Sequence, residues 1–207
     1  MGLIFLILAV VVLVTGVFWW CEKKVPSGQA TCGLGLSDFS RREFDALLNK
    51  RKFSALTSWV NTPYLSQFFA GTVNGMNTCV FTISRSRYSP TTFGILLTSL
   101  DLPIPKFILK PKTFTKEVGD MLGIGDHRAS FPQSLVDMYD ISSEDDGTFA
   151  AMLRPEIITF FLHHEGLSVE YQNGALLVTP SLISNEQNYE PAVQRTHTLA
   201  QLLGQSR

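Results

Sequence analysis

The stretch Phe68–Ser84, FFAGTVNGMNTCVFTIS, decides the fold class. At its centre stands Asn74-Gly75, the dipeptide most typical of a two-residue type I′ hairpin turn, in which both central residues take a positive φ. After the turn, apolar side chains recur at every second position, at Cys79, Phe81 and Ile83. Because the side chains of a strand alternate between its two faces, this pattern predicts an antiparallel hairpin over 68–73 and 76–84 with one buried face.

The chain on the C-terminal side of this hairpin predicts further strands. Thr92–Leu100 and Lys106–Lys110 have strand-like composition and are separated by DLPIP, whose two prolines interrupt a strand. Strands that follow one another in this way predict a β-meander. Later, Asn173-Gly174 separates the alternating runs Leu167–Tyr171 and Ala175–Thr179, which predicts a second hairpin.

Helix signals surround the strands. Ser40 and Glu43 stand at capping-box spacing, and apolar residues at helical spacing follow them in one helix or two. The acidic run 144–146 suits a helix start before Thr148, because carboxylates there complement the helix dipole. The other predicted helices are Thr113–Leu122, Pro155–His164 and a closing helix from Tyr189 to Leu203. No element is predicted for Phe131–Tyr139.

These elements are mixed without alternating as βαβ units, which predicts an α+β fold. In detail we expect an antiparallel β-meander with short helices and a C-terminal helix over a curved sheet, similar to a pleckstrin-homology roll. The chain of 207 residues holds 15 phenylalanines and a formal net charge of −1. It can therefore bury one aromatic-rich core, and without a basic excess nucleic acid is not an expected partner.

The N-terminal stretch Leu3–Trp20 reads LIFLILAVVVLVTGVFWW and contains no charged residue. A helix of this length, at about 1.5 Å per residue, nearly matches the roughly 30 Å hydrocarbon layer of a bilayer. We therefore predict a transmembrane helix over 2–20, a linker rich in small residues over 21–36 and a soluble α+β domain over 37–207. A cleaved signal peptide is the competing interpretation, but the sequence lacks its positive n-region and its small residues before the cleavage site.

The residues that follow this segment predict its orientation. Two tryptophans stand where an aromatic belt lies, and two lysines come directly after them, while no Lys or Arg precedes the helix. The positive-inside rule then predicts a single-pass protein of the cell (inner) membrane with its domain in the cytoplasm. The lipid bilayer is the predicted partner, and the predicted contacts with its surface are Trp19, Trp20, Lys23, Lys24, Arg41 and Arg42. For the two arginines, a solvated helix face is the alternative.

The clearest cluster of titratable residues is His163-His164-Glu165. Neighbouring residues on a helix point about 100° apart, and this spacing matches no zinc motif, so cations at a helix C-terminus are the simpler interpretation. Asp126-His127 is an acid and base pair by adjacency alone, and no nucleophile motif accompanies it. We therefore expect no catalytic, metal or cofactor site.

Other suggestive residues have structural interpretations. GLG at Gly33 and GIGD at Gly123 lack the lysine of a phosphate loop and are predicted to be turns. The consecutive acids 144–146 lack the alternating spacing of a calcium loop. We expect three rings to pack in the core rather than to line a pocket: Phe107, Phe131 and Phe149. Three residues are predicted to be free thiols, namely Cys21, Cys32 and Cys79. A Cys21–Cys32 disulfide remains the alternative in an oxidising compartment.

Three stretches carry a family resemblance: LPIPKFILKPKTFTKEVGDMLGIGD from 102, SFPQSLVDMYDISSEDD from 130, and RPEIITFFLHHEGLSVEYQNGALLV from 154. Together they resemble a pattern in uncharacterised, mainly bacterial membrane-anchored proteins of unknown function, which carry one or two N-terminal spans before an α+β domain. The matching residues are Pro105, Phe107, Leu109, Pro111, Lys112, Phe131, Tyr139, Val169, Glu170 and Leu177. Ile141 stands where that pattern has leucine. The resemblance implies this architecture and a bacterial origin, and it transfers no catalytic residue.

Taken together, the sequence predicts a membrane-anchored, non-catalytic binding or assembly module, with the lipid surface or another membrane protein as its partner. The alternative hypothesis is a membrane-anchored hydrolase that uses Asp126, His127 or His163.

Overall fold

The computed structural model describes residues 34–49, 53, 65–84, 91–112, 131–180 and 189–205. Its helices are α2 (Arg41–Asn49), α5 (Gln133–Met138), α6 (Asp146–Met152), α7 (Pro155–His163) and α8 (Glu190–Gly204). Its strands are β1 (Ser37–Asp38), β2 (Leu65–Val73), β3 (Met76–Ser84), β4 (Thr91–Thr98), β5 (Phe107–Pro111), β6 (Tyr139–Ser143), β7 (Leu167–Gln172) and β8 (Ala175–Pro180).

The predicted transmembrane helix over 2–20 lies outside the described residues, as does the predicted helix Thr113–Leu122. Within the part of the chain that the structure describes, no helix combines the length and the apolar character that crossing a bilayer requires. Leu36, at the end of the predicted linker, is buried and packs into the core, so it belongs to the folded unit that begins at residue 34.

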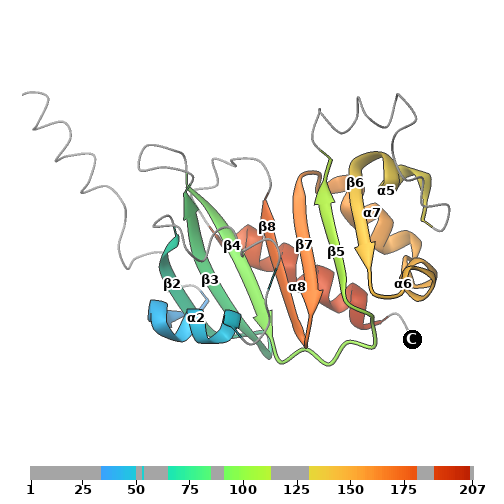
Figure 1. The fold of residues 1–207 in the computed structure, drawn as a ribbon. Coiled ribbons are helices and arrows are strands. Elements are labelled where there is room, and N and C mark those ends of the chain that lie inside the picture. Colours follow the sequence, from blue (N-terminus) through green and yellow to red (C-terminus); the bar gives the residue numbers. More distant parts are fainter. Residues whose placement is uncertain are drawn as a thin grey trace, which may run out of the picture. The chain divides into compact units, whose positions relative to one another are not determined.

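The described strands form one antiparallel sheet in the order β1-β2-β3-β4-β8-β7-β5-β6, which confirms the α+β class (Figure 1). Both predicted hairpins are present, and Asn74 and Asn173 have the positive φ that their turns require. The predicted meander is correct only from β2 to β4. Its fourth strand, β5, pairs with β7 and β6 instead of β4, which pairs with β8.

The composition of the second hairpin explains why it separates β4 from β5. Four consecutive residues of β8, Ala175–Val178, are buried, so this strand must be covered on both of its faces. Such a strand is stable at the centre of a sheet and not at its edge. The connection from β4 to β5, residues 99–106, consequently passes the ends of β8 and β7 (Figure 1). Leu100 N–H donates to Gly174 O at 2.8 Å, which fixes this crossover to the hairpin turn.

One face of the sheet, called here the first face, carries the larger core. It is formed by alternate residues of the central and C-terminal strands, and α8 packs behind β4, β8 and β7 in Figure 1. The helix α7 packs against α8 and α5. Phe107, Phe131 and Phe149 lie in this core, as expected, with Phe107 and Phe149 stacked at 4.4 Å between ring centroids.

The opposite face, called here the second face, carries a smaller core beneath α2. Phe44 of α2 is fully buried, and its ring centroid lies 4.7 Å from the rings of both Phe68 and Phe81. The register of β2 and β3 shifts between Ser66 and Phe68. Because one extra residue reverses the alternation of side chains, this bulge lets Leu65 and Phe68 face the same core.

One further prediction needs correction, and one unassigned segment gains a structure. The strand β3 was expected to have one buried face, but Thr78 and Thr82 on its polar side are buried as well as Phe81. The reason is its central position, with α2 over one face and α8 over the other. No element was predicted for Phe131–Tyr139, yet this segment forms α5 and leads directly into β6, whose pairing with β5 completes the sheet. The roll-like closure of the sheet stays a prediction, since β1 and β6 are its edges among the described strands.

Candidate functional site

The helix α2 begins as its capping box predicts. The Ser40 N–H donates to Glu43 Oε2 at 3.0 Å, and the Glu43 N–H donates to Ser40 Oγ at 3.2 Å. The Ser40 hydroxyl, which also donates to Glu43 Oε2, and then the Ser40 N–H hold the pKa of the Glu43 carboxyl below its usual value. The first turn therefore keeps its negative charge near the helix N-terminus, where it is favourable.

The two arginines predicted to contact lipid differ in their surroundings. Arg41 Nη1 donates to Leu65 O at 3.2 Å, and Arg41 Nε lies 3.5 Å from Asp45 Oδ2. Its guanidinium also stands 5.9 Å from the centroid of the Phe68 ring. Arg41 therefore fastens α2 to the sheet, whereas Arg42 is exposed and available to a surface. Trp19, Trp20, Lys23 and Lys24 lie outside the described residues.

The acidic run Glu144–Asp146 forms the turn between β6 and α6. Asp145 Oδ1 accepts from the Thr148 N–H at 2.9 Å, and Asp145 Oδ2 accepts from Thr148 Oγ1 at 2.7 Å. These bonds lower the pKa of Asp145, with the backbone N–H as the largest cause. Asp146 Oδ1 accepts from the Ser143 N–H at 3.2 Å. Asp145 is thus the N-cap residue of α6, and the acidic run marks a helix start, as the sequence predicted.

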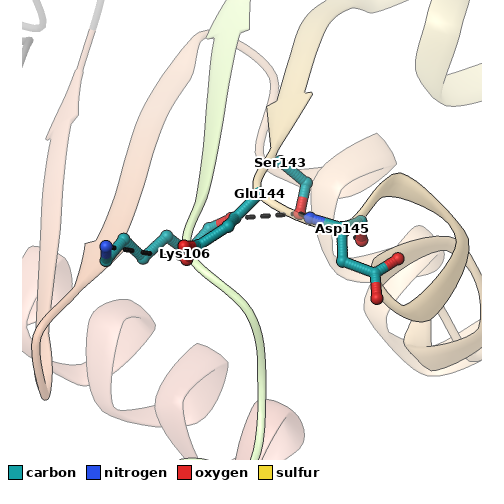
Figure 2. Close-up of polar contacts among 4 residues, drawn as sticks. All are labelled: Lys106, Ser143, Glu144 and Asp145. Atoms are coloured by element: carbon teal, nitrogen blue, oxygen red, sulfur yellow. Dashed lines mark hydrogen bonds and ion pairs between the residues drawn. The ribbon is translucent and has the colours of Figure 1, made fainter.

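A cross-strand arrangement of charges continues from this turn along β5 and β6. Lys106 Nζ lies 3.6 Å from Glu144 Oε2, and Ser143 Oγ donates to Lys106 O at 3.0 Å (Figure 2). Two residues further along each strand, Ile108 is opposite Ser142, and then Lys110 is opposite Asp140. Since directly opposite residues share a face, these residues lie together on the second face, beyond the core under α2. Their polar members, called here the polar strip, flank Ile108 and are Lys106, Glu144, Ser142, Lys110 and Asp140.

Glu170 of β7 borders this strip. It is opposite Ile108 on one side and Leu177 on the other, and only 3% of its surface is exposed. Gln172 Nε2 donates to Glu170 Oε1 at 3.1 Å. The polar strip exposes hydrogen-bonding groups, whereas Glu170 at its border is buried, and together they include no nucleophile beside a general base.

The histidine pair lies at the end of α7, as predicted. His163 is exposed, and its Nδ1 lies 2.8 Å from the carbonyl oxygen of Thr159 in its own helix. His164 contacts the Phe160 ring, with 4.6 Å between ring centroids. Desolvation, then the charges of Arg195 and His163, lower the pKa of His164. The two imidazoles therefore serve different contacts and do not converge on one ligand.

The other candidate reactive groups are an adjacent Asp-His pair and the cysteines. Asp126 and His127, like Cys21 and Cys32, lie outside the described residues. Across the described ranges, no three His, Cys, Asp or Glu side chains lie close enough together to hold a metal ion. Cys79 is a buried free thiol, and burial raises its pKa to about 12, so it is a poor nucleophile at neutral pH.

Two buried polar residues were missed by the sequence reasoning. His197 of α8 meets Thr78 of β3, with 2.9 Å between Nε2 and Oγ1. His197 stands four residues after Val193 and three before Ala200, and both of these are buried. Residues at this spacing lie on one side of a helix, so the sequence could have placed His197 on the core face of α8. Glu170, between Val169 and Tyr171, is likewise a charged residue inside an apolar strand.

No protein-family model matches the chain, and no curated protein sequence matches it. The resemblance to mainly bacterial membrane-anchored proteins accordingly stays a prediction. The candidate site rests on the geometry of the described residues alone: an exposed arginine on α2 and the polar strip of β5 and β6 with Glu170.

Proposed function

We propose that the protein is a membrane-anchored, non-catalytic binding or assembly module whose partner is the lipid surface or another membrane protein. This proposal rests on one observation: the side chains that could take part in catalysis make structural contacts instead. Asp145 caps a helix, His163 contacts its own helix carbonyl, and the Cys79 thiol is buried and protonated. Charged residues on the outer strands instead form opposed pairs, an arrangement suited to recognition.

The anchor is supported by the uncharged segment Leu3–Trp20. Its test is fractionation of the full chain: we expect extraction by detergent and not by high salt or alkaline carbonate. The variant Leu8→Arg/Val12→Arg places two charges in the segment, each disfavoured by about 3 kcal/mol at the centre of a span, and should move the protein into the soluble fraction. The matched variant Leu8→Ile/Val12→Leu should stay with the membrane. Wild-type protein that is soluble without detergent would contradict the proposal.

Contact with anionic lipid is proposed for Lys23, Lys24 and Arg42. Each basic residue near such a surface contributes about 1 kcal/mol, so Arg42→Glu should reduce association of the α2 region with the bilayer in vesicles that contain phosphatidylglycerol. This contact is measured by comparing the protection of α2 from amide exchange in the presence of anionic vesicles with its protection in the presence of neutral vesicles. Lys106→Glu is the matched control, because Lys106 is also an exposed cation but stands on the polar strip. Equal effects of both variants would show nonspecific charge attraction.

A protein partner is tested by crosslinking in intact membranes. We expect a recurrent crosslinked protein that is lost when Lys110→Glu reverses a charge of the polar strip and retained in Gln133→Glu, an exposed position on α5. Repeated absence of a partner, together with equal behaviour in anionic and neutral vesicles, would overturn the proposal. Metal bound to the purified full chain, or an activity lost in His127→Ala, would establish the hydrolase in its place.

The finer architecture is part of the same proposal. A pleckstrin-homology-like roll would require the sheet to curve so that its two ends cross. An experimental structure of the full chain in a bilayer mimic, with the course of β1 and β6 resolved, tests this directly.

A further inference from the structure

The contact between α8 and the sheet includes a histidine in an unusual setting. His197 is 2% exposed and Thr78, which it meets, is equally buried. His197 Nε2 lies 2.9 Å from Thr78 Oγ1, and Nδ1 has no hydrogen-bond partner among the described residues. A buried polar contact between α8 and β3 therefore lies beside the apolar first-face core.

The hydrogen bonds around Thr78 assign the tautomer of this imidazole. Thr78 Oγ1 lies 3.1 Å from Met76 O, which can only accept, so the single hydroxyl proton is directed to that carbonyl. The Thr78 oxygen then accepts from Nε2–H of His197. The neutral ring is left with a lone pair on Nδ1, whereas protonation would place an N–H donor there without an acceptor, in addition to a buried charge.

The described elements around His197 supply no anion to stabilise such a charge. The strands β3 and β4 contain no charged residue, and Cys79 lies on the second face. Just before α7, the cation Arg154 donates from Nη2 to Leu202 O of α8 at 3.0 Å. On α7, Glu156 and His163 are exposed, and His164 and the exposed Glu165 follow at its end. On α8 itself, Glu190 stands seven residues before His197, and Arg195 is a cation. Burial accordingly lowers the pKa of His197, with desolvation as its cause.

We propose that His197 is an acid-sensitive latch, which holds α8 against β3 while neutral and weakens the docking of α8 on the sheet when the pH falls. Release would expose the apolar side of α8, which includes Val193, Leu199 and Leu203, and the first-face core beneath it. The element that moves is thus the single helix α8, and the change that moves it is the binding of one proton to the His197 imidazole.

The expected size follows from linkage. In the released state the pKa of the imidazole is about 6.5, and in the docked state it is lower. The docked state therefore loses stability as the pH falls from about 6.5 towards the lowered value, since the released state binds more protons. Between pH 7.5 and 5.5 the loss in the docking equilibrium is at most about tenfold, the limit reached if the docked imidazole stays neutral at pH 5.5.

The test is amide exchange of the full chain in a bilayer mimic at pH 7.5 and 5.5, corrected for intrinsic rates. We expect the protection of residues 190–204 to fall, by at most about tenfold, while that of 76–84 changes little. His197→Gln keeps an amide donor near the Nε2 position and cannot titrate, so it should abolish the pH effect. His164→Gln and His163→Gln are matched controls that should retain it.

The latch would be refuted if α8 kept its protection at pH 5.5, if 76–84 lost as much as α8, or if His164→Gln removed the effect. Because His197→Gln could fail to fold, the wild-type imidazole is also followed by NMR. A His197 resonance that titrates near pH 6.5 in the docked state would refute the proposal equally.

Discussion

The two faces of the sheet are covered in different ways. The first face is buried under α7 and α8 together with the rings of Phe107 and Phe149, so its core spans almost the whole sheet. On the second face, α2 with Phe44 and Leu48 covers the N-terminal strands, and the other half ends in the polar strip of β5 and β6. The two faces therefore differ in composition: apolar side chains close the first face, whereas half of the second face carries the charged groups that we propose serve recognition.

The same comparison explains where buried polar groups lie. On the first face, His197 meets Thr78 beside the apolar core. On the second face, Glu170 lies at the border between the apolar core and the polar strip. A buried polar group in the middle of a core costs stability when its hydrogen bonding changes, which makes the first-face contact a suitable point for control.

The largest expected effect comes from the first face. Phe107→Ala removes a fully buried ring that stacks on Phe149 at 4.4 Å and lies 6.1 Å from the Tyr171 ring. The cavity should lower the free energy of unfolding of the whole folded unit by about 4 kcal/mol. Chemical denaturation of the full chain, followed by circular dichroism, measures this loss.

Phe44→Ala on the second face is the matched variant for this measurement. It removes a ring of the same size, but from a nine-residue helix that packs at one end of the sheet. We expect exchange to accelerate in α2 while α7 and α8 keep their protection, because a short peripheral helix can open locally. A uniform loss of protection would show that the two cores form one cooperative unit.

A close contact beneath α2 gives the next effect. Gly94 is opposite Phe81, and a methyl group at Gly94 would overlap that ring. Gly94→Ala should therefore lower the free energy of unfolding by about 2 kcal/mol. In the background of Phe81→Ala the same substitution should have almost no further effect, which a double-mutant cycle can determine. Additive losses would mean that the strain lies in the backbone.

A smaller effect is expected where the first-face helices begin. Asp145→Ala removes both acceptors for Thr148 and should destabilise α6 less than Gly94→Ala destabilises the sheet. Because the pKa of Asp145 is lowered in the fold, its contribution is complete above about pH 4 and is lost as the pH falls through the lowered value. Thermal unfolding between pH 7 and 3 should therefore show a shallower acid decline in Asp145→Ala than in the wild type.

The smallest effect belongs to the polar strip. Lys106 and Glu144 form an ion pair at 3.6 Å with side chains 49% and 63% exposed (Figure 2). Lys106→Ala should change the free energy of unfolding by less than about 0.5 kcal/mol, since solvent screens such pairs. A loss comparable with that of Gly94→Ala would show that the strip stabilises the fold and would weaken its assignment as a recognition surface.

Local structure could be predicted from the sequence wherever a short-range preference determines it. The two Asn-Gly turns, the Ser40–Glu43 capping box and the helices α6, α7 and α8 all depend on backbone preferences or on helical periodicity within a few residues. The segment that forms α5 and β6 escaped prediction because a six-residue helix and a five-residue strand are too short to show a clear period. Of the candidate site, only Arg42 was predicted from the sequence. The polar strip could not be predicted, because its residues come together only through the pairing of strands that are distant in the sequence.

The sequence alone therefore determined the α+β class, both hairpins and the aromatic core. Tertiary structure decided that the hairpin of β7 and β8 lies between β4 and β5, that Lys106 meets Glu144, and that His197 reaches Thr78 across 119 positions of the chain. The physical reason is that strands far apart in sequence pair according to which apolar faces remain to be covered once the local elements have formed. That choice minimises exposed apolar area over the whole chain, and no short stretch of residues encodes it.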